Sequence, residues 1–321
     1  MTKTRIVTTA PIDAVAIDIL ETVAPLETSP GSDEESMMKL LDGTIGIVCR
    51  GEGKVTERMI EACPELRVIG RSGVGYDSVD VAAATARKIP LVYAPVGGFA
   101  VAEGALALLL TLVKMIPRCD DAVKSGQWNK RYQFKPGDMT DHTLGIVGLG
   151  RIGAQLARLV QNFSMTVLAY DPIATPEQAE ELGIQLVEFD ELIEKSDFIS
   201  LHVPLTDDTR GMINRNSIAA MKKGAILVNL ARGGVIESLD VLADALEAGQ
   251  LAGVGLDVFD SEPPDVSHRL FRDPRCICAP HLLGTSQLAM DRIFRTMATG
   301  MVEVLRGNRP EYCVNPEVFE S

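Results

Sequence analysis

The chain has 321 residues, of which 46% are hydrophobic and 23% are charged, a globular composition in a chain long enough for two domains. Its 31 basic and 44 acidic residues give a net charge of −13, which repels a phosphate backbone and argues against nucleic acid as a partner. The six cysteines contain no C-x-x-C pair, so we expect reduced thiols and no metal site. No apolar run reaches the roughly 20 residues of a membrane span, so we expect no membrane contact and a cytoplasmic location.

The first part of the chain alternates short β-branched runs with helical segments. This alternation predicts a parallel sheet joined by crossover helices. The expected strands are Arg5–Thr8, Ile45–Cys49, Arg67–Gly70 and Leu91–Tyr93, and the expected helices begin at Pro11 or cover Thr56–Ala62 and Ser78–Arg87.

A long, strongly apolar segment follows at Ala100–Ser125. Its length exceeds what a crossover connection needs, so we expect one long helix here. It is a candidate for contact between domains and between subunits.

The stretch Asp141–Gly153 reads as a strand, a tight turn and a helix, with the pattern G-x-G-x-x-G at Gly148, Gly150 and Gly153. In such a motif the first glycine makes the turn, the second lets the backbone approach a pyrophosphate, and the third lets the helix pack closely on the strand. The helix N-terminus then faces the anion. We therefore expect a dinucleotide site at this turn.

Asp171 ends the next expected strand, 21 residues after Gly150. An acidic residue at this distance suits the ribose hydroxyls of NAD. The residues that follow it, Pro172-Ile173-Ala174, provide no arginine for a 2′-phosphate. The sequence therefore favours NAD over NADP.

A second alternating series begins at Asp141. Its expected strands are Gly145–Val147, Val167–Tyr170, Phe198–Leu201, Ile226–Asn229, Gly253–Val258 and Ile277–Ala279. The final helix, Thr285–Arg306, exceeds what this sheet needs, so we expect the chain to return to the first domain. We predict an α/β protein with two doubly wound parallel-sheet domains: a substrate domain of residues 1–99 and 288–321, and an NAD-binding Rossmann domain of residues 100–287.

Four polar residues follow or end strands of the second series, where ligands of an open parallel sheet bind. They are Arg232, Asp257, Glu262 and His281, and we expect them to converge. His281, between Pro280 and Gly284, is the best acid–base candidate. Of the other histidines, we expect His142 on the surface, His202 in a structural or cofactor-lining role, and His268 solvated in a polar loop.

Ordered motifs along nearly the whole chain resemble the D-isomer-specific 2-hydroxyacid dehydrogenase family. The carrying segments are RSGVGYDSVD (Arg71–Asp80), VAE (Val101–Glu103), GIVGLGRIG (Gly145–Gly153), LHVPLT (Leu201–Thr206), LVNLARGGVI (Leu227–Ile236), GLDVFDSEPP (Gly255–Pro264) and APHLLGT (Ala279–Thr285). The resemblance implies two doubly wound domains, of which the substrate domain is flavodoxin-like, and a homodimer with the helix after Glu103 at its interface.

The resemblance also implies the roles of individual residues. Arg232, Glu262 and His281 correspond to the family's catalytic residues, and the implied cofactor contacts beyond the glycines are Arg151, Ile152, Asp171, Val203, Ala231 and Asp257. The chemistry agrees, because a guanidinium can grip a carboxylate and polarise the adjacent carbonyl, while an imidazolium can supply the proton that the product alkoxide needs. A carboxylate beside the imidazole favours its charged form.

Arg50 and Arg71 each follow or end a strand of the first series and suggest an anion-binding site. The loop that follows Arg71, with Gly73 and Val74, resembles the family loop whose backbone N–H groups hold the substrate carboxylate, leaving the arginines for a second, distal charge. This arrangement resembles phosphoglycerate dehydrogenases, without room for the regulatory domain of the longer ones. The alternative is that both arginines pair with surface acids.

We therefore expect an NAD-dependent oxidoreductase acting on a small, anionic D-2-hydroxy acid or 2-oxo acid, 3-phosphoglycerate and phosphohydroxypyruvate among the candidates. Three alternatives stay open. One is a glyoxylate or hydroxypyruvate reductase. A second is an NAD-sensing interaction protein like the corepressor relatives of the family. The third is a formate dehydrogenase, a branch that lacks the acidic partner of the histidine, which is present here as Glu262.

Overall fold

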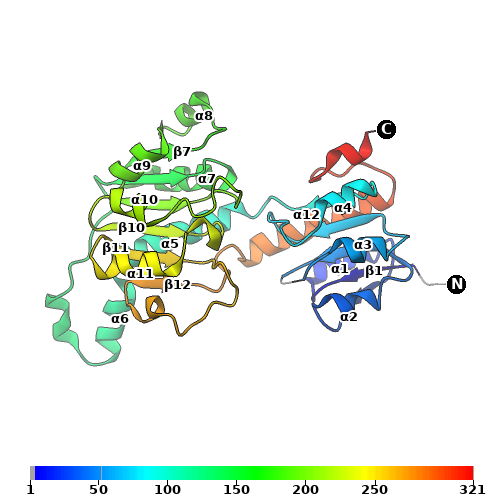
Figure 1. The fold of residues 1–321 in the computed structure, drawn as a ribbon, viewed down its shortest axis with the longest axis horizontal. Helices are drawn as coiled ribbons and strands as arrows, with labels where there is room; N and C mark the ends of the chain where they lie inside the picture. Colours follow the sequence, from blue (N-terminus) through cyan, green and yellow to red (C-terminus); the bar gives the residue numbers. More distant parts are fainter. Residues whose placement is uncertain (1–3, 52, 321) are drawn as a thin grey trace. The chain divides into compact units, whose positions relative to one another are not determined.

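The computed structural model describes residues 4–51 and 53–320, and the chain divides into two compact units. Unit 1 comprises Met1–Gly97 and Thr285–Ser321, and unit 2 comprises Gly98–Gly284. Each unit contains one wholly parallel sheet with helices packed on it (Figure 1). The predicted fold class, α/β with two doubly wound sheets, is confirmed.

The sheet of unit 1 has five strands in the order β2-β1-β3-β4-β5. They are β1 Arg5–Thr8, β2 Leu26–Thr28, β3 Thr44–Cys49, β4 Val68–Arg71 and β5 Leu91–Tyr93. The helices are α1 Ala14–Leu20, α2 Glu34–Met38, α3 Glu57–Glu61, α4 Val81–Ala86 and α12 Gln287–Leu305, with the 3₁₀ helix η5 at Pro316–Phe319. Each α-helix begins at a side chain that accepts a hydrogen bond from the first turn; these residues are Asp13, Asp33, Thr56, Asp80 and Ser286.

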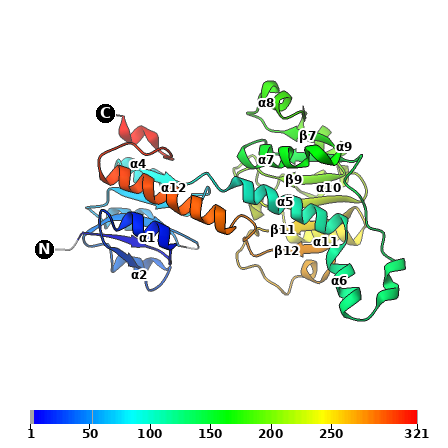
Figure 2. The same ribbon diagram turned by 180° about the vertical axis from the view of Figure 1, so that it is seen from behind.

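Both faces of this sheet are buried, because successive strand residues point to opposite sides. Ile6 and Val48 belong to the core under α1 and α12, whereas their neighbours Val7 and Ile47 belong to the core under α2, α3 and α4. Figure 2 shows α1 and α12 side by side on one face of the sheet. The C-terminal helix therefore completes the core of the N-terminal unit.

The sheet of unit 2 has seven strands in the order β12-β11-β10-β9-β6-β7-β8. They are β6 Thr143–Val147, β7 Thr166–Tyr170, β8 Gln185–Leu186, β9 Phe198–Leu201, β10 Ala225–Asn229, β11 Leu251–Leu256 and β12 Cys276–Cys278. The helices are α5 Gly98–Val113, α6 Ile116–Lys124, α7 Arg151–Val160, α8 Pro176–Glu181, α9 Phe189–Lys195, α10 Arg215–Ala220 and α11 Leu239–Glu247. Short 3₁₀ helices lie at η1 Trp128–Tyr132, η2 Gln161–Phe163, η3 Gly233–Val235 and η4 Arg269–Arg272.

Strand order reverses between β6 and β9, which are adjacent in the sheet although far apart in sequence. Helices α5, α7 and α8 cover one face, and α9, α10 and α11 cover the other. In doubly wound sheets, ligands bind beyond the carboxyl ends of the strands at such a switch point. The glycine turn after β6 and the His202-Val203 segment after β9 meet here.

The expected single helix over Ala100–Ser125 is wrong. The structure has two helices, α5 and α6, which meet at an angle of 58°. Met115 at the break has a φ of 54°, and Pro117 in the first turn of α6 has no N–H to continue α5.

Among the described residues no single helix is long and apolar enough to span a membrane; only this bent pair reaches the required length and hydropathy.

Other elements depart from the expected boundaries. Strand β11 ends at Leu256 rather than at Val258, so Asp257 lies just beyond the strand and not on it. Two short edge strands, β2 and β8, were not predicted, since three-residue and two-residue pairings leave little periodicity in the sequence.

Candidate active site

The glycines of the predicted dinucleotide motif lie at the turn between β6 and α7. Gly148 has a φ of 97°, and a Cβ on it would lie 2.8 Å from the backbone carbonyl of His202. A Cβ on Gly153 would lie 2.0 Å from the Gly148 oxygen, whereas a Cβ on Gly150 would meet nothing within 4 Å. Gly148 and Gly153 are therefore required for close packing, and Gly150 borders open space at the N-terminus of α7. This space fits a pyrophosphate.

Asp171 connects this turn to an open cavity of about 470 Å³. Its carboxylate accepts hydrogen bonds from the N–H groups of Leu149 and Ile173, both at 2.8 Å. A carboxylate has further lone pairs, so the same group can also accept ribose hydroxyls. The cavity is lined by Tyr170, Asp171, Pro172, Leu186, Val187, Glu188 and Glu191, a mixture of apolar and acidic side chains that fits an adenosine.

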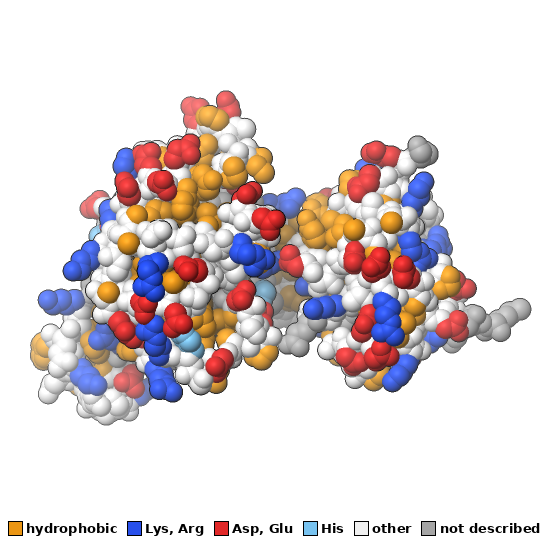
Figure 3. Space-filling model, viewed as in Figure 1, with side chains coloured by type: hydrophobic (Ala, Val, Ile, Leu, Met, Phe, Trp, Pro, Cys, Tyr) orange, Lys and Arg blue, Asp and Glu red, His pale blue; other side chains and the backbone are white. Residues whose placement is uncertain are grey.

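Carboxylates surround this end of unit 2. Figure 3 shows acidic side chains gathered over α8 and α9, and Glu188 and Glu191 line the cavity beside Asp171. No lysine or arginine is among the cavity's lining residues in the described parts of the chain. This negative field disfavours a ribose that carries a 2′-phosphate.

His281 and Glu262 form a direct pair in unit 2. The Nδ1 of His281 lies 2.8 Å from Oε2 of Glu262, and the other oxygen, Oε1, accepts a hydrogen bond from the N–H of Phe259 at 3.0 Å. A carboxylate can only accept at Nδ1–H, so this contact assigns the Nδ1 proton and directs Nε2 to the other side of the ring. His281 keeps 53% of its side chain exposed, so Nε2 can reach a substrate.

The backbone around His281 is held from both sides by the end of β11. Ala279, before it, donates its N–H to the carbonyl of Leu256 at 2.8 Å. Leu282 and Leu283, after it, donate their N–H groups to the carboxylate of Asp257. Burial raises the pKa of Asp257, although these two N–H donors act against that shift. His281 itself has a φ of 52°, which directs its side chain out of the line of the strand.

Arg232 starts the turn after β10. The side chain of buried Asn229 fixes this turn, because it accepts from the N–H of Ala231 and donates to the carbonyl of Arg232, both at 2.9 Å. One N–H of the Arg232 guanidinium donates to the Ala231 carbonyl at 2.7 Å. From the sequence, Asn229 was identified only as the end of a strand. Its position three residues before Arg232 was the feature that could have indicated its role in holding this turn.

The loops that carry Arg232 and Glu262 touch directly. A Cβ on Gly233 would lie 1.9 Å from the carbonyl carbon of Phe259 and 2.1 Å from the nitrogen of Asp260. Gly233 directly follows Arg232, and the N–H of Phe259 donates a hydrogen bond to the carboxylate of Glu262. Three strand ends, those of β10, β11 and β12, thus bring the predicted trio into one region.

His202 lies at the switch point. Its Nε2 lies 2.8 Å from the hydroxyl of Ser200, and its buried Nδ1 has no hydrogen-bond partner among the described residues. Burial lowers the pKa of His202 to about 4. The neighbouring Val203 is buried at the same strand end. A half-buried ring that burial keeps neutral is suited to packing rather than to proton transfer at neutral pH.

Among the remaining predicted cofactor contacts, Arg151 is exposed and Ile152 half-buried in the first turn of α7, and Ala231 is buried beside Arg232.

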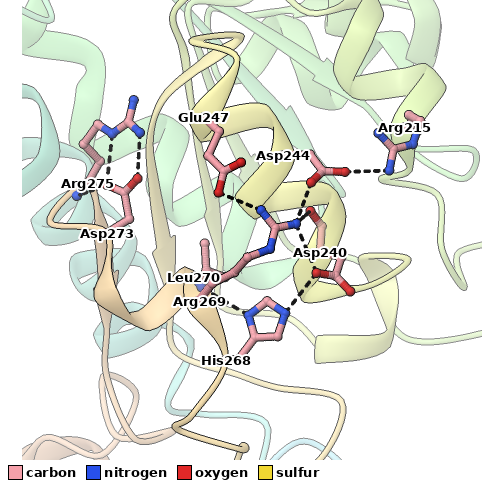
Figure 4. A network of polar contacts seen from close by, with 9 residues as sticks. All are labelled: Arg215, Asp240, Asp244, Glu247, His268, Arg269, Leu270, Asp273 and Arg275. Atoms are coloured by element: carbon pink, nitrogen blue, oxygen red, sulfur yellow. Dashed lines mark hydrogen bonds and ion pairs between the residues drawn. The ribbon is translucent and has the colours of Figure 1, made fainter.

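The expectation of a solvated His268 is wrong. His268 is half-buried at the start of η4, where Nδ1 accepts from the N–H of Leu270 and Nε2 lies 3.3 Å from Asp240. Figure 4 shows the network around it, in which Arg269 pairs with Asp240, Asp244 and Glu247 of α11. These contacts fix the loop that leads into β12.

The predicted substrate residues lie together in unit 1. Arg71 is paired in register with Cys49, the residue before Arg50, so both arginines lie at the carboxyl edge of the same sheet. Thr9 anchors Arg50, because its buried hydroxyl donates to the Arg50 carbonyl and accepts from the Arg50 N–H. The Arg50 guanidinium lies 5.0 Å from the centre of the Phe294 ring.

The loop after Arg71 continues this edge of the sheet. The Arg71 guanidinium donates to the carbonyls of Cys49 and Ser72, at 3.3 and 3.2 Å. Gly73 has a φ of 147° with nothing within 4 Å of its Cβ position, and Val74 is exposed. Open space therefore borders this backbone, where the Gly73 N–H donates to the Arg71 carbonyl at 3.0 Å.

Comparison with known proteins places the geometry in context. Residues 106–282 match the family model of the D-isomer specific 2-hydroxyacid dehydrogenase, NAD binding domain. The D-3-phosphoglycerate dehydrogenase of Methanocaldococcus jannaschii is 40% identical over 313 residues, which are 97% of this chain and 59% of that protein. The chain thus spans less than two thirds of the length of that relative.

Two solved structures show the same fold over nearly the whole chain. The D-lactate dehydrogenase of Aquifex aeolicus, complexed with NAD and lactic acid, is 28% identical with a TM-score of 0.88, covering 97% of this chain and 99% of that one. A glyoxylate reductase from Paecilomyes thermophila is 28% identical with a TM-score of 0.88, covering 98% and 99% of the two chains.

Proposed function

The chain belongs to the D-isomer specific 2-hydroxyacid dehydrogenase family, whose NAD-binding domain it contains, and we propose that it is an NAD-dependent dehydrogenase of a small, anionic D-2-hydroxy acid. The observation that carries this proposal is the pair of His281 Nδ1 and Glu262 Oε2 at 2.8 Å, on loops that also carry Arg232, within the NAD-binding unit. Binding alone does not need an imidazole whose tautomer is fixed in this way, whereas proton transfer does.

In this proposal, the three side chains have distinct tasks. NADH, when bound, supplies the hydride for the substrate carbonyl. Arg232 binds the substrate carboxylate and polarises the neighbouring carbonyl oxygen. His281 donates the Nε2 proton to that oxygen in reduction and removes it in oxidation. Glu262 keeps the ring oriented and stabilises its positive charge.

We propose NAD rather than NADP as the cofactor. Gly150 borders the space for the pyrophosphate, and Asp171 lines the adenosine cavity together with Glu188 and Glu191. Arg151, Ile152, Val203, Ala231 and Asp257 remain proposed cofactor contacts. Each lies at the start of α7 or at the end of β9, β10 or β11, the edge of the sheet where family members bind the dinucleotide.

For the substrate, we propose a 2-oxo acid with a second, distal anion, phosphohydroxypyruvate being the example suggested by the relatives' name. Support comes from unit 1, where Arg50 and Arg71 lie on adjacent strand ends and the backbone at Gly73 and Val74 borders open space for a carboxylate. Arginine is well suited to phosphate because its planar N–H groups match the oxyanion.

An NADH oxidation screen tests both proposals. We expect phosphohydroxypyruvate to be reduced with a higher kcat/KM than hydroxypyruvate, glyoxylate or pyruvate. Arg50→Gln and Arg71→Gln should raise KM for the phosphorylated substrate and leave KM for glyoxylate nearly unchanged. Arg58→Gln is the matched control, because Arg58 is exposed on α3, where it pairs with Glu35 of α2.

The screen also separates the alternatives. If glyoxylate or hydroxypyruvate is the better substrate, the distal-anion proposal is wrong and the reductase alternative holds. If no 2-oxo acid is reduced although NADH binds, the dehydrogenase proposal fails and the NAD-sensing interaction protein remains.

We further propose that the protein is a homodimer that uses α5, α6 and η1. Four large apolar side chains are exposed on α6 and η1: Ile116, Val123, Trp128 and Tyr132, which are 54%, 59%, 57% and 74% exposed. Figure 2 shows this segment extending from the end of α5, away from the sheet of unit 2. Apolar side chains gathered on an extended segment favour a protein contact.

A further inference from the structure

Two cysteine thiols face each other on the edge strand β12. Cys276 and Cys278 occupy alternate strand positions, so their side chains lie on the same face, and their Sγ atoms are 3.5 Å apart. The residue between them, Ile277, points to the opposite face, where it lines a cavity with Thr111 and Pro117 of the α5–α6 segment. The thiols therefore face away from the proposed subunit contact.

The strand can bring these thiols into covalent contact only by changing shape. Two residues of a β-strand advance about 6.6 Å and their side chains leave the same face nearly in parallel, whereas the Cβ atoms of a disulfide lie only about 3.5–4.5 Å apart. Closing an S–S bond of about 2.0 Å therefore contracts the strand. Because β12 pairs only with β11, its outer side has no partner strand among the described residues to resist this contraction.

The two thiols differ in access and in acidity. Cys278 is exposed, whereas Cys276 is half-buried and packs against the core under α11. The two sulfur atoms are in hydrogen-bond contact, and this contact lowers the pKa of the Cys278 thiol. The same contact, together with burial, raises the pKa of Cys276. Cys278 is thus the accessible nucleophile, and Cys276 is the second thiol already beside it.

Contraction of β12 would reach the proposed acid–base residue. His281 follows Cys278 by three positions, and Ala279 between them is fixed to Leu256 of β11 by a 2.8 Å hydrogen bond. On its other side His281 is fixed through Leu282 to Asp257. A shift of the first anchor without the second must change the orientation of the ring relative to Glu262.

We propose that Cys276 and Cys278 are an oxidant-sensitive pair that closes to an intrachain disulfide on exposure to a peroxide and thereby displaces His281. The Cys278 thiolate attacks a peroxide oxygen, the O–O bond breaks, and the released hydroxide takes a proton to become water. Cys276 then loses its proton and attacks the sulfenic sulfur, so that the S–S bond forms, the S–O bond breaks and a second water leaves. Two thiols are oxidised by two electrons, and one hydrogen peroxide is reduced.

Peptide mapping of the full-length protein tests disulfide formation. Trypsin releases residues 276–292, which contain both of these cysteines and none of the other four. After hydrogen peroxide treatment and alkylation, we expect this peptide to lose two hydrogens and take up no alkyl group, and a dithiol reductant should restore double alkylation. Cys276→Ser and Cys278→Ser should abolish the closed peptide, while Cys119→Ser, in α6, is the matched control and should keep it.

Activity measurements test the displacement of His281, a step that depends on the proposed dehydrogenase function. Closure should lower kcat by about tenfold or more, as expected for a misplaced catalytic group, and NADH affinity should stay nearly unchanged. Cys278→Ser should retain its activity in peroxide. Reduction should restore the parent's activity at the same rate as it restores double alkylation.

Failure of this inference is distinguishable from failure of the proposed function. A peptide 276–292 that remains fully alkylated, gains oxygens on a cysteine sulfur rather than on Met290, or forms a bridge between two chains overturns the pair. A closed peptide with unchanged kcat overturns the displacement of His281. A protein without dehydrogenase activity before oxidation instead overturns the proposed function, and the peptide masses still decide whether the disulfide forms.

Discussion

At the scale of single residues, the chemistry of unit 2 depends on where protons and charges are held. Glu262 holds the Nδ1 proton of His281, and Asp171 holds the glycine turn while it lines the adenosine cavity. His202 is instead kept neutral by burial. Three ionisable side chains in one unit thus have three different tasks, and each makes a separate prediction.

His281→Ala should reduce turnover by about 10² to 10⁴, the usual contribution of a general acid–base group. NADH affinity, measured by fluorescence titration, should stay within about twofold of the parent, because the lost group acts on the substrate and not on the cofactor. His142→Ala is the control, since the ring of the exposed His142 lies against Thr140 and Phe198, outside the predicted trio. Equal turnover of the parent and the His281 variant would falsify the assignment.

Asp171→Asn should weaken discrimination between the two nicotinamide cofactors. It removes the negative charge but keeps an oxygen that can accept the bond from Leu149. We expect the ratio of kcat/KM for NADH to that for NADPH to fall by about tenfold, in line with the loss of one charged hydrogen bond. Asp190→Asn, at an exposed position of α9, should leave the ratio unchanged; an equal response of both variants contradicts the role of Asp171.

The burial of His202 predicts a loss of stability in acid. The pKa of His202 is about 4 in the folded chain, whereas its ordinary value, which applies to the unfolded chain, is 6.5. Between pH 4 and pH 6.5 the unfolded chain therefore binds more protons than the folded chain. The contribution is fully present above pH 6.5 and is lost as the pH falls toward 4. By pH 5 the loss is about 2 kcal/mol.

His202→Gln provides the comparison, because other titrating groups cancel between the two proteins. Urea unfolding at pH 7.5 and pH 5 should show the parent losing about 2 kcal/mol more than the variant. If both lose the same free energy of unfolding, His202 is not held neutral in the folded state.

At the scale of elements, one edge of the unit 1 sheet is secured by a segment that is distant in sequence. In unit 1, the C-terminal segment pairs with the edge strand β5 through a bridge between Val92 and Cys313 and a hydrogen bond from the N–H of Val314 to Leu91. Asn315 is only 1% exposed, and its side chain bonds to the Leu91 N–H, the Thr85 hydroxyl and the Ile89 carbonyl. The tail thus covers an edge that would otherwise be open to pairing.

Asn315→Ala should lower the free energy of unfolding by about 1–3 kcal/mol, because it leaves buried backbone groups without a partner. Asn308→Ala is the matched control, since the side-chain amide of the exposed Asn308 donates to the nearby Glu303 in the last turn of α12. Chemical denaturation of the two variants measures the difference. A change in Asn315→Ala no greater than in the control would show that the tail contributes little to unit 1.

At the scale of the whole molecule, an acidic chain with exposed apolar side chains on one segment favours self-association over contact with polyanions. We expect sedimentation equilibrium to give twice the 34.6 kDa mass of one chain. A double variant with Val123→Glu and Trp128→Glu should shift the mass toward one chain, because it puts charges into the proposed contact.

Ile173→Glu is the control for this contact, since Ile173 is 87% exposed beside the adenosine cavity and far from α6 in sequence. It should leave the dimer intact. A parent protein that sediments as a single chain, or a control that dissociates as readily as the double variant, contradicts the proposed dimer.

The sequence by itself determined the two parallel sheets and the residues at their strand ends. Alternation of buried strands and helices has a clear period, and the spacing from Gly148 to Asp171 is a local property of one strand, one turn and one helix. The strand pattern also located Arg232 and His281 just after strands and Glu262 a short loop after another, and the family resemblance then implied their catalytic roles.

Only the tertiary structure decided how these residues are held. The 2.8 Å contact between His281 and Glu262, the two anchors of the His281 segment on β11, and the buried ring of His202 depend on segments distant in sequence. The bend between α5 and α6, by contrast, has a local signal in the sequence, because Pro117 lies just after Met115, where the backbone turns left-handed. Periodicity reports which face of an element is buried, whereas hydrogen-bond partners are decided by the packing of elements against each other.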